Sequence, residues 1–176
     1  MGSRTLLVLG MVAWGAAGLG QSLQEARIDE TDTRAVMKAN FLYHFAAGND
    51  WPEEVKRGNF RVAVIGNERM YRELVDKYAL KPIGAQPLEV VRAEPGTLTG
   101  FFHIVYAEGA DVRKLAGNIG SRPTLLVTGR SGALAEGAAI NFVVRNNRIL
   151  YEIDPGAASR RGVLLGSKIL SWAVSN

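Results

Sequence analysis

The two histidines, His44 and His103, are the side chains in this chain best suited to acid–base chemistry or metal binding. A zinc site needs two or three further ligands at defined spacing, and no His-x-x-x-His or Glu-x-x-His pattern occurs. His103 falls within an apolar run, which is typical of a histidine satisfied in the core or at a sheet edge. Asn40 and His44 are four residues apart on a predicted helix, so they share a face. The ordinary interpretation of His44 is a structural or surface role, and the more specific one is a joint contact of Asn40 and His44 with a partner.

The remaining patterns do not support catalysis. The chain has no cysteine, which excludes thiol chemistry, disulfides and cysteine metal sites. No Gly-x-Ser-x-Gly nucleophile motif is present. The segment 162–168 resembles a phosphate loop only superficially, because its lysine does not directly follow the second glycine. Glu53-Glu54 is a pair of adjacent carboxylates, which is typical of a solvated surface. We therefore predict a protein that is not an enzyme and has no cofactor and no metal.

The charge pattern argues against nucleic acid. The formal charge is +4, but no run of five or six basic residues or basic stripe with aromatic residues is present. Arg160-Arg161 is the only basic doublet outside mixed-charge sequence. The excess is weak evidence for an acidic partner. We name Arg160 and Arg161 as candidate partner contacts.

The first twenty residues predict an export signal. Arg4 precedes an apolar run from Thr5 to Ala13, and small residues follow, so cleavage after Gly20 or Ala17 fits the small-x-small rule. A transmembrane anchor is the alternative, but a span needs roughly 20 apolar residues. We expect a cleavable signal peptide at 1–20, a flexible lead at 21–30 and a single domain at 31–176. The mature protein should be soluble, with no membrane insertion.

The domain should open with a helix that begins near Thr31 or Asp32, since either side chain can cap a first turn. Gly48-Asn49-Asp50 should end it. One side carries the apolar residues at helical spacing: Met37, Phe41, Leu42 and Phe45. Trp51-Pro52 follows as an extended step. Trp51 is either a core anchor that packs back on this helix near Phe41 or Phe45, or an exposed partner contact, and burial is the favoured interpretation.

Four short apolar runs, at 60–65, 87–91, 101–106 and 124–128, read as strands covered on both faces. Helices predicted at 70–78 and 111–119 alternate with them, which indicates a largely parallel sheet. Two later runs, at 140–145 and 148–153, flank Asn146-Asn147 and predict an antiparallel hairpin. A closing helix is expected from about Ala157 to Val174. The predicted fold class is α/β, with three layers and a mainly parallel sheet that ends in a C-terminal antiparallel hairpin.

Several stretches together resemble the YfiR family. They are the segment 38–46 with the Trp-Pro step, the strand 62–66, the segment 148–154 and the closing segment 161–170. They run in order from about 33 to 174. The resemblance implies a bacterial periplasmic protein that binds the extracytoplasmic domain of an inner-membrane diguanylate cyclase and holds it inactive. It also implies a tendency to form homodimers, and it implies no catalytic residues.

This chain departs from the family pattern at three places. His44 stands where the family often has asparagine, and Gly48-Asn49 replace an apolar pair. The two cysteines that many members carry fall at Ala63 and Phe102. If those cysteines pair, the resemblance implies that strands 60–65 and 101–106 are parallel neighbours, with the Phe102 ring near Ala63. That places the first three strands in the order 2-1-3.

Two functions remain open after the sequence is considered. The first is the cyclase-binding regulatory module, for which Asn40, His44, Trp51, Arg160 and Arg161 are the candidate partner contacts. The alternative is a periplasmic small-ligand-binding domain of another envelope system. A cyclase-binding module predicts a flat apolar patch, whereas a ligand-binding domain predicts a deep closed pocket.

Overall fold

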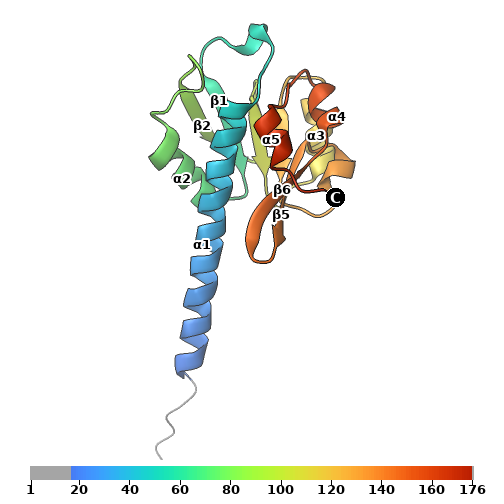
Figure 1. Ribbon diagram of the computed structural model, residues 1–176. Helices are drawn as coiled ribbons and strands as arrows, with labels where there is room; N and C mark the ends of the chain where they lie inside the picture. Colours follow the sequence, from blue (N-terminus) through green and yellow to red (C-terminus); the bar gives the residue numbers. More distant parts are fainter. Residues whose placement is uncertain (1–16, 176) are drawn as a thin grey trace, which may run out of the picture. The chain divides into compact units, whose positions relative to one another are not determined.

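The computed structural model describes residues 17–175, and the chain divides between Thr31 and Asp32 into two units. The first helix, α1, runs from Ala17 to Gly48 (Figure 1). It begins N-terminal to the predicted start and takes in residues 21–30, the predicted flexible lead. Gln, Leu, Glu, Ala and Arg favour helix there, and no glycine or proline interrupts. Residues 1–16 of the predicted signal peptide lie outside the described residues.

A single six-stranded sheet forms the centre of the domain, with the order β2-β1-β3-β4-β5-β6. Its strands are β1 (Phe60–Ile65), β2 (Leu88–Arg92), β3 (Ile104–Ala107), β4 (Leu125–Thr128), β5 (Ile140–Arg145) and β6 (Arg148–Ile153). The first five are parallel where they pair, and β6 pairs antiparallel with β5. The predicted fold class and the 2-1-3 order of the first three strands are therefore confirmed.

Helices cover both faces of this sheet, which makes the three layers (Figure 1). One apolar cluster joins one face to α1, α2 (Glu68–Tyr78), α4 (Pro155–Ser159) and α5 (Ser167–Ser171). The other joins the opposite face to α3 (Val112–Ile119) and the 3-10 turn η2 (Ala133–Glu136). A second 3-10 turn, η1 (Glu53–Val55), follows the Trp-Pro step. Among the described residues, no helix is long and apolar enough to cross a membrane.

The β5–β6 hairpin forms as its turn residues predict. Asn146 and Asn147 have φ angles of 50° and 58°, the left-handed region that asparagine tolerates. Arg145 therefore pairs directly with Arg148 across the turn.

Helix α3 also begins as predicted. The Asp111 side chain accepts a hydrogen bond of 3.0 Å from the backbone N–H of Lys114 and caps the helix.

The predicted closing helix from Ala157 to Val174 is wrong in its extent. The chain forms two short helices, α4 and α5, with a non-helical segment at 160–166 between them. Gly162 has a φ of +73°, a conformation that ends a helix. Leu164 and Asp50 exchange two backbone hydrogen bonds of 2.9 Å, which fix the segment against the end of α1. Gly166 allows this close approach, because a Cβ there would overlap the Gly48 carbonyl oxygen.

Ala63 and Phe102 are not opposite each other, although β1 and β3 are parallel neighbours as predicted. The register places Val105 beside Ala63. Phe102 precedes β3, and the Arg61 guanidinium lies 4.4 Å from the centre of its ring. Both residues still belong to the same apolar cluster. The two positions do not pair across the strands because β3 begins at Ile104, later than the apolar run suggested.

Trp51 is buried, as was favoured from the sequence, but its ring contacts differ from those predicted. Its ring packs edge-on against Phe60 at 4.9 Å and lies 6.0 Å from His103. Phe41 and Phe45 instead contact Phe142 and Tyr151. The Trp-Pro step therefore anchors the start of β1 rather than returning to the middle of α1.

Candidate functional site

The two predicted partner contacts on α1, Asn40 and His44, differ in how free their side chains are. His44 is exposed, and its ring lies edge-on to Tyr43 at 6.2 Å. Asn40 is also exposed, but its Oδ1 accepts a hydrogen bond of 2.8 Å from the Tyr78 hydroxyl. That bond ties α1 to α2 and fixes the Asn40 side chain. His44 is therefore the freer of the two for contact with a partner.

The other three predicted contacts do not share one surface. Arg160 is exposed, whereas Trp51 and Arg161 are buried. Arg161 donates to the carbonyl oxygens of Gly120 (3.3 Å) and Gly137 (3.0 Å). It therefore clamps two loops together, one after α3 and one after η2. Arg160 is the only member of the basic doublet that is placed to meet a partner directly.

The densest polar cluster lies where parallel strands β1 and β3 end, at the point where the chain order of the sheet reverses. Lys38 of α1 donates to the Tyr106 hydroxyl at 3.1 Å and to Glu108 Oε1 at 3.3 Å. Glu108 Oε2 accepts from the Tyr106 hydroxyl at 2.7 Å and from Asn67 Nδ2 at 2.6 Å. Asn67 Oδ1 also caps α2 through Met70 N–H. In open α/β sheets this edge is the usual place for a functional site.

Burial and hydrogen bonding shift the pKa values of Glu108 and Tyr106 in opposite directions. Burial works to raise the pKa of Glu108, but the hydrogen bonds from Asn67 and Tyr106 and the charge of Lys38 outweigh it and hold the pKa below its usual value. Burial, with the neighbouring Glu108 charge, raises the pKa of Tyr106. The carboxylate therefore stays charged and the phenol stays protonated. The cluster fixes α1 on the sheet.

This cluster was not predicted from the sequence, although one signal for it was present. Lys38 is three residues after Ala35 and four before Leu42, both buried. A lysine at that spacing lies on the core face of an amphipathic helix, and a lysine there needs a buried partner. The partner itself, Glu108, is 70 residues away in sequence, and no local pattern identifies it.

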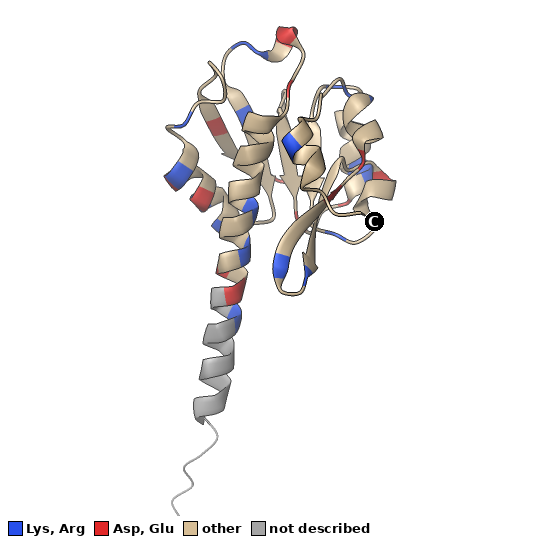
Figure 2. Ribbon diagram, in the orientation of Figure 1, with Lys and Arg blue, Asp and Glu red and all other residues tan. Residues whose placement is uncertain are grey.

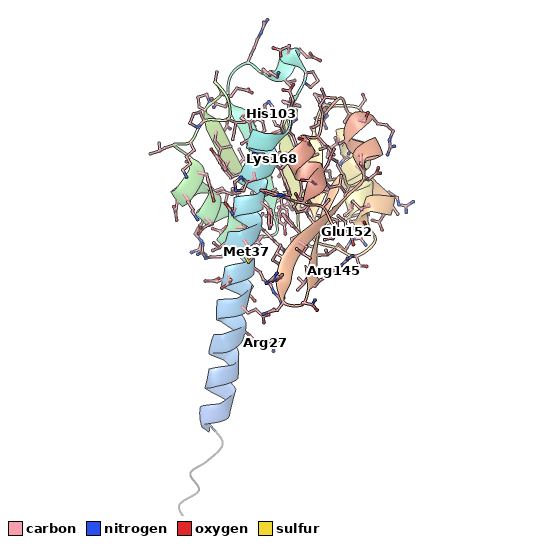
Figure 3. All side chains as sticks on the ribbon, in the orientation of Figure 1. Arg27, Met37, His103, Arg145, Glu152 and Lys168 are labelled. Atoms are coloured by element: carbon pink, nitrogen blue, oxygen red, sulfur yellow. The ribbon has the colours of Figure 1, made fainter. Side chains whose placement is uncertain are left out.

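His103 is the satisfied core histidine that its apolar context predicted. Its Nδ1 accepts from the Arg61 backbone N–H at 3.0 Å, and its Nε2 lies 2.9 Å from the Val55 carbonyl oxygen. An acceptor at Nδ1 and a donor at Nε2 define the neutral tautomer with the proton on Nε2. Burial lowers the pKa of His103. Figure 3 places it at the end of the sheet near η1.

The described part of the chain bears several hollows that open to solvent. One, of about 400 Å³, lies between the loop 129–135 and β5. Glu152 lines it and pairs with Arg145 across the hairpin at 2.9 Å (Figure 3). A second, of about 280 Å³, lies beside Trp51. No group of three or more metal-ligating side chains occurs among the described residues.

The surface also bears exposed apolar side chains. Three of them, Leu164, Leu170 and Trp172, fall within nine residues around α5. Basic and acidic residues are interspersed over the rest of the domain (Figure 2). This combination fits protein contact better than it fits a polyanion.

The model of a family described as YfiR/HmsC-like matches residues 35–174. This range begins within α1 and ends beyond α5, so it includes every strand of the sheet. No curated protein sequence matches the chain.

Proposed function

This chain belongs to the YfiR/HmsC-like family, and on that ground we propose that it is a non-enzymatic periplasmic module that binds and restrains an inner-membrane diguanylate cyclase. The observation that carries the proposal is the family match over residues 35–174, which takes in both apolar clusters. At the level of the family, these proteins are periplasmic regulators of diguanylate cyclase signalling. The cyclase that this chain meets, and the restraint itself, belong to the proposal.

Three of the predicted residues are exposed and supply polar contacts for this function. His44, Asn40 and Arg160 are accessible polar groups. Trp51 and Arg161 are buried and support the surface loops by their packing and hydrogen bonds. A cyclase-binding module needs exposed apolar area, and Leu170 and Trp172 contribute it. Export by the predicted signal peptide at 1–20 and assembly as a homodimer complete the proposal. The mass of the purified protein in solution tests the dimer.

A clean deletion of the gene tests the function. Loss of a restraining module should raise cellular cyclic di-GMP and surface attachment, because the cyclase is then no longer inhibited. Cyclic di-GMP is measured by mass spectrometry in cells that express the cyclase. A pull-down from solubilised inner membranes with the tagged mature chain identifies that cyclase.

Complementation supplies the matched control. The full chain should restore low cyclic di-GMP, while a chain that starts at Gln21 stays in the cytoplasm and should not. Unchanged nucleotide levels in the deletion strain would rule out restraint. Full complementation by the unexported chain would instead rule out a periplasmic site of action.

A further inference from the structure

A further hollow, also of about 280 Å³, lies between α4 and the loops that follow α3 and η2. Its lining is made of small and basic residues: Gly120, Ser121, Gly137, Ala157, Arg160 and Arg161. None of the described residues that line it is acidic. The hollow therefore combines room for a small ligand with a positive wall.

Arg161 brings a buried positive charge to this wall. The residue is only 9% exposed, and it forms no ion pair within the described part of the chain. Its guanidinium donates instead to two uncharged carbonyl oxygens, those of Gly120 and Gly137. Burial and the charge of Arg160 lower the pKa of Arg161, whereas Asp154 raises it. Buried charges are normally paired, so this cation calls for an anion that the surrounding residues do not provide.

One nitrogen of the Arg161 guanidinium is accessible from the hollow. Nε and Nη1 donate to the two carbonyl oxygens, whereas Nη2 makes no hydrogen bond in the described part of the chain. The unpaired side-chain nitrogens that are sealed from solvent there are Asn49 Nδ2 and Trp51 Nε1, so Nη2 is in contact with solvent. A Cβ added to Gly137, which lines the hollow, would lie 3.8 Å from Nη2. The missing side chain at Gly137 therefore leaves Nη2 uncovered on the side of the hollow.

The charges around the hollow determine the kind of ligand. Arg160 also lines it and is exposed, and its Nη2 lies 3.6 Å from Asp154 Oδ2. The two arginines carry two positive charges and Asp154 carries one negative charge, which leaves +1. Ser121 is exposed and brings a hydroxyl donor to the same hollow. An oxyanion balances the remaining charge and accepts strong, charge-assisted hydrogen bonds from a guanidinium, whereas a cation would be repelled.

We propose that this hollow is a binding site for a small oxyanion, such as phosphate or the carboxylate of a small molecule. Arg161 Nη2 donates to an oxygen of the anion, and Arg160 and Ser121 add positive charge and a hydroxyl donor. Because Arg161 is buried, a small free ion reaches it, whereas the surface of a partner protein meets only Arg160. The site does not depend on the proposed function, since it rests on the unpaired buried arginine.

Inorganic phosphate and acetate test the site in the purified exported protein, without the cyclase. Each is titrated at pH 7, with the ionic strength held constant by sodium chloride, so that simple screening of charge does not change. The Ser121 backbone amide and the Arg161 Nε–H resonance are followed by ¹⁵N NMR, and the latter is identified by its loss in Arg161→Lys. Both resonances should shift saturably with phosphate and with acetate.

Three variants and a matched control locate the bound ion. Arg161→Lys and Arg160→Gln should each weaken phosphate binding, the first by at least about tenfold because it removes the planar donor. Ser121→Glu, at an exposed position, places a carboxylate beside the arginines and should abolish binding while the protein stays folded. Arg148→Gln removes an exposed arginine of β6 and should leave binding unchanged.

Three results would overturn the proposal. The first is the absence of a saturable shift with either anion, as expected for a hollow that takes up only water. The second is an equal loss of binding in Arg148→Gln and Arg160→Gln, which would show attraction to the overall charge of the protein. The third is unchanged binding in Ser121→Glu, which would place the ion elsewhere. Because Ser121 and Arg160 are exposed, these variants test the site even if Arg161→Lys does not fold.

Discussion

Replacing Glu108 with leucine should lower the free energy of unfolding by about 3 kcal/mol, because it leaves the Lys38 ammonium without its carboxylate and two donors unpaired. The Lys38 side chain is only 12% exposed, so water cannot take the place of the lost partner. The value lies at the lower end for a buried pair, since Glu108 itself is 40% exposed. Urea denaturation of the purified protein measures it.

A double-mutant cycle shows whether the ion pair is the cause. The double variant Lys38→Met, Glu108→Leu removes both charges and should lose less stability than the sum of the two single losses, by about 1 kcal/mol or more. Lys114→Met, at an exposed position on α3, is the matched control and should change stability by less than about 0.5 kcal/mol. Strict additivity of the two single changes would show that Lys38 and Glu108 are not coupled.

The protein should also lose stability between pH 7 and pH 5.5 because of His103, by at most about 1 kcal/mol. Burial lowers the pKa of His103 in the folded state, whereas the unfolded chain titrates near 6.5. The unfolded state therefore binds more protons as the pH falls below about 6.5, and stability falls with it. A charged ring would also lose its Nδ1 acceptor function toward Arg61.

Two histidine variants isolate this effect. His103→Gln should be less stable at pH 7, but its stability should change little down to pH 5.5. His44→Gln, at the exposed histidine, is the matched control for the removal of a histidine. The carboxylates with lowered pKa values, including Glu89 and Glu108, lose their contribution only as the pH falls below about 4.5. A wild-type protein with flat stability over this window would contradict the neutral assignment of His103.

Local sequence signals explain why the sheet could be predicted. Each strand is a short apolar run, and its limits are marked by nearby glycine, proline or asparagine, as at Gly66 and at the Asn146-Asn147 turn. The first strand and the hairpin were predicted with their observed bounds for this reason. The start of β3 was not, because Phe101 and Phe102 extend the apolar run beyond the residues that pair with β1.

The errors arise where distant residues decide the local structure. Segment 160–166 leaves the helical conformation because Leu164 pairs with Asp50, which is 114 residues earlier. The same holds for the candidate sites. The Lys38–Glu108 pair and the hydrogen bond between Asn49 and Gly166 form only after the chain has folded. Composition and spacing predicted a buried Trp51, but not that its ring would pack edge-on against Phe60.

The most direct test of the central claim is cyclic di-GMP synthesis by the intact cyclase when the purified mature chain is added from the periplasmic side. Spheroplasts that express the identified cyclase and lack the chromosomal gene receive increasing amounts of the protein outside the membrane, and cyclic di-GMP is measured by mass spectrometry. We predict a saturable fall in its synthesis, and no fall with heat-unfolded protein. An unchanged rate of synthesis at saturating protein would contradict restraint of the cyclase by this chain.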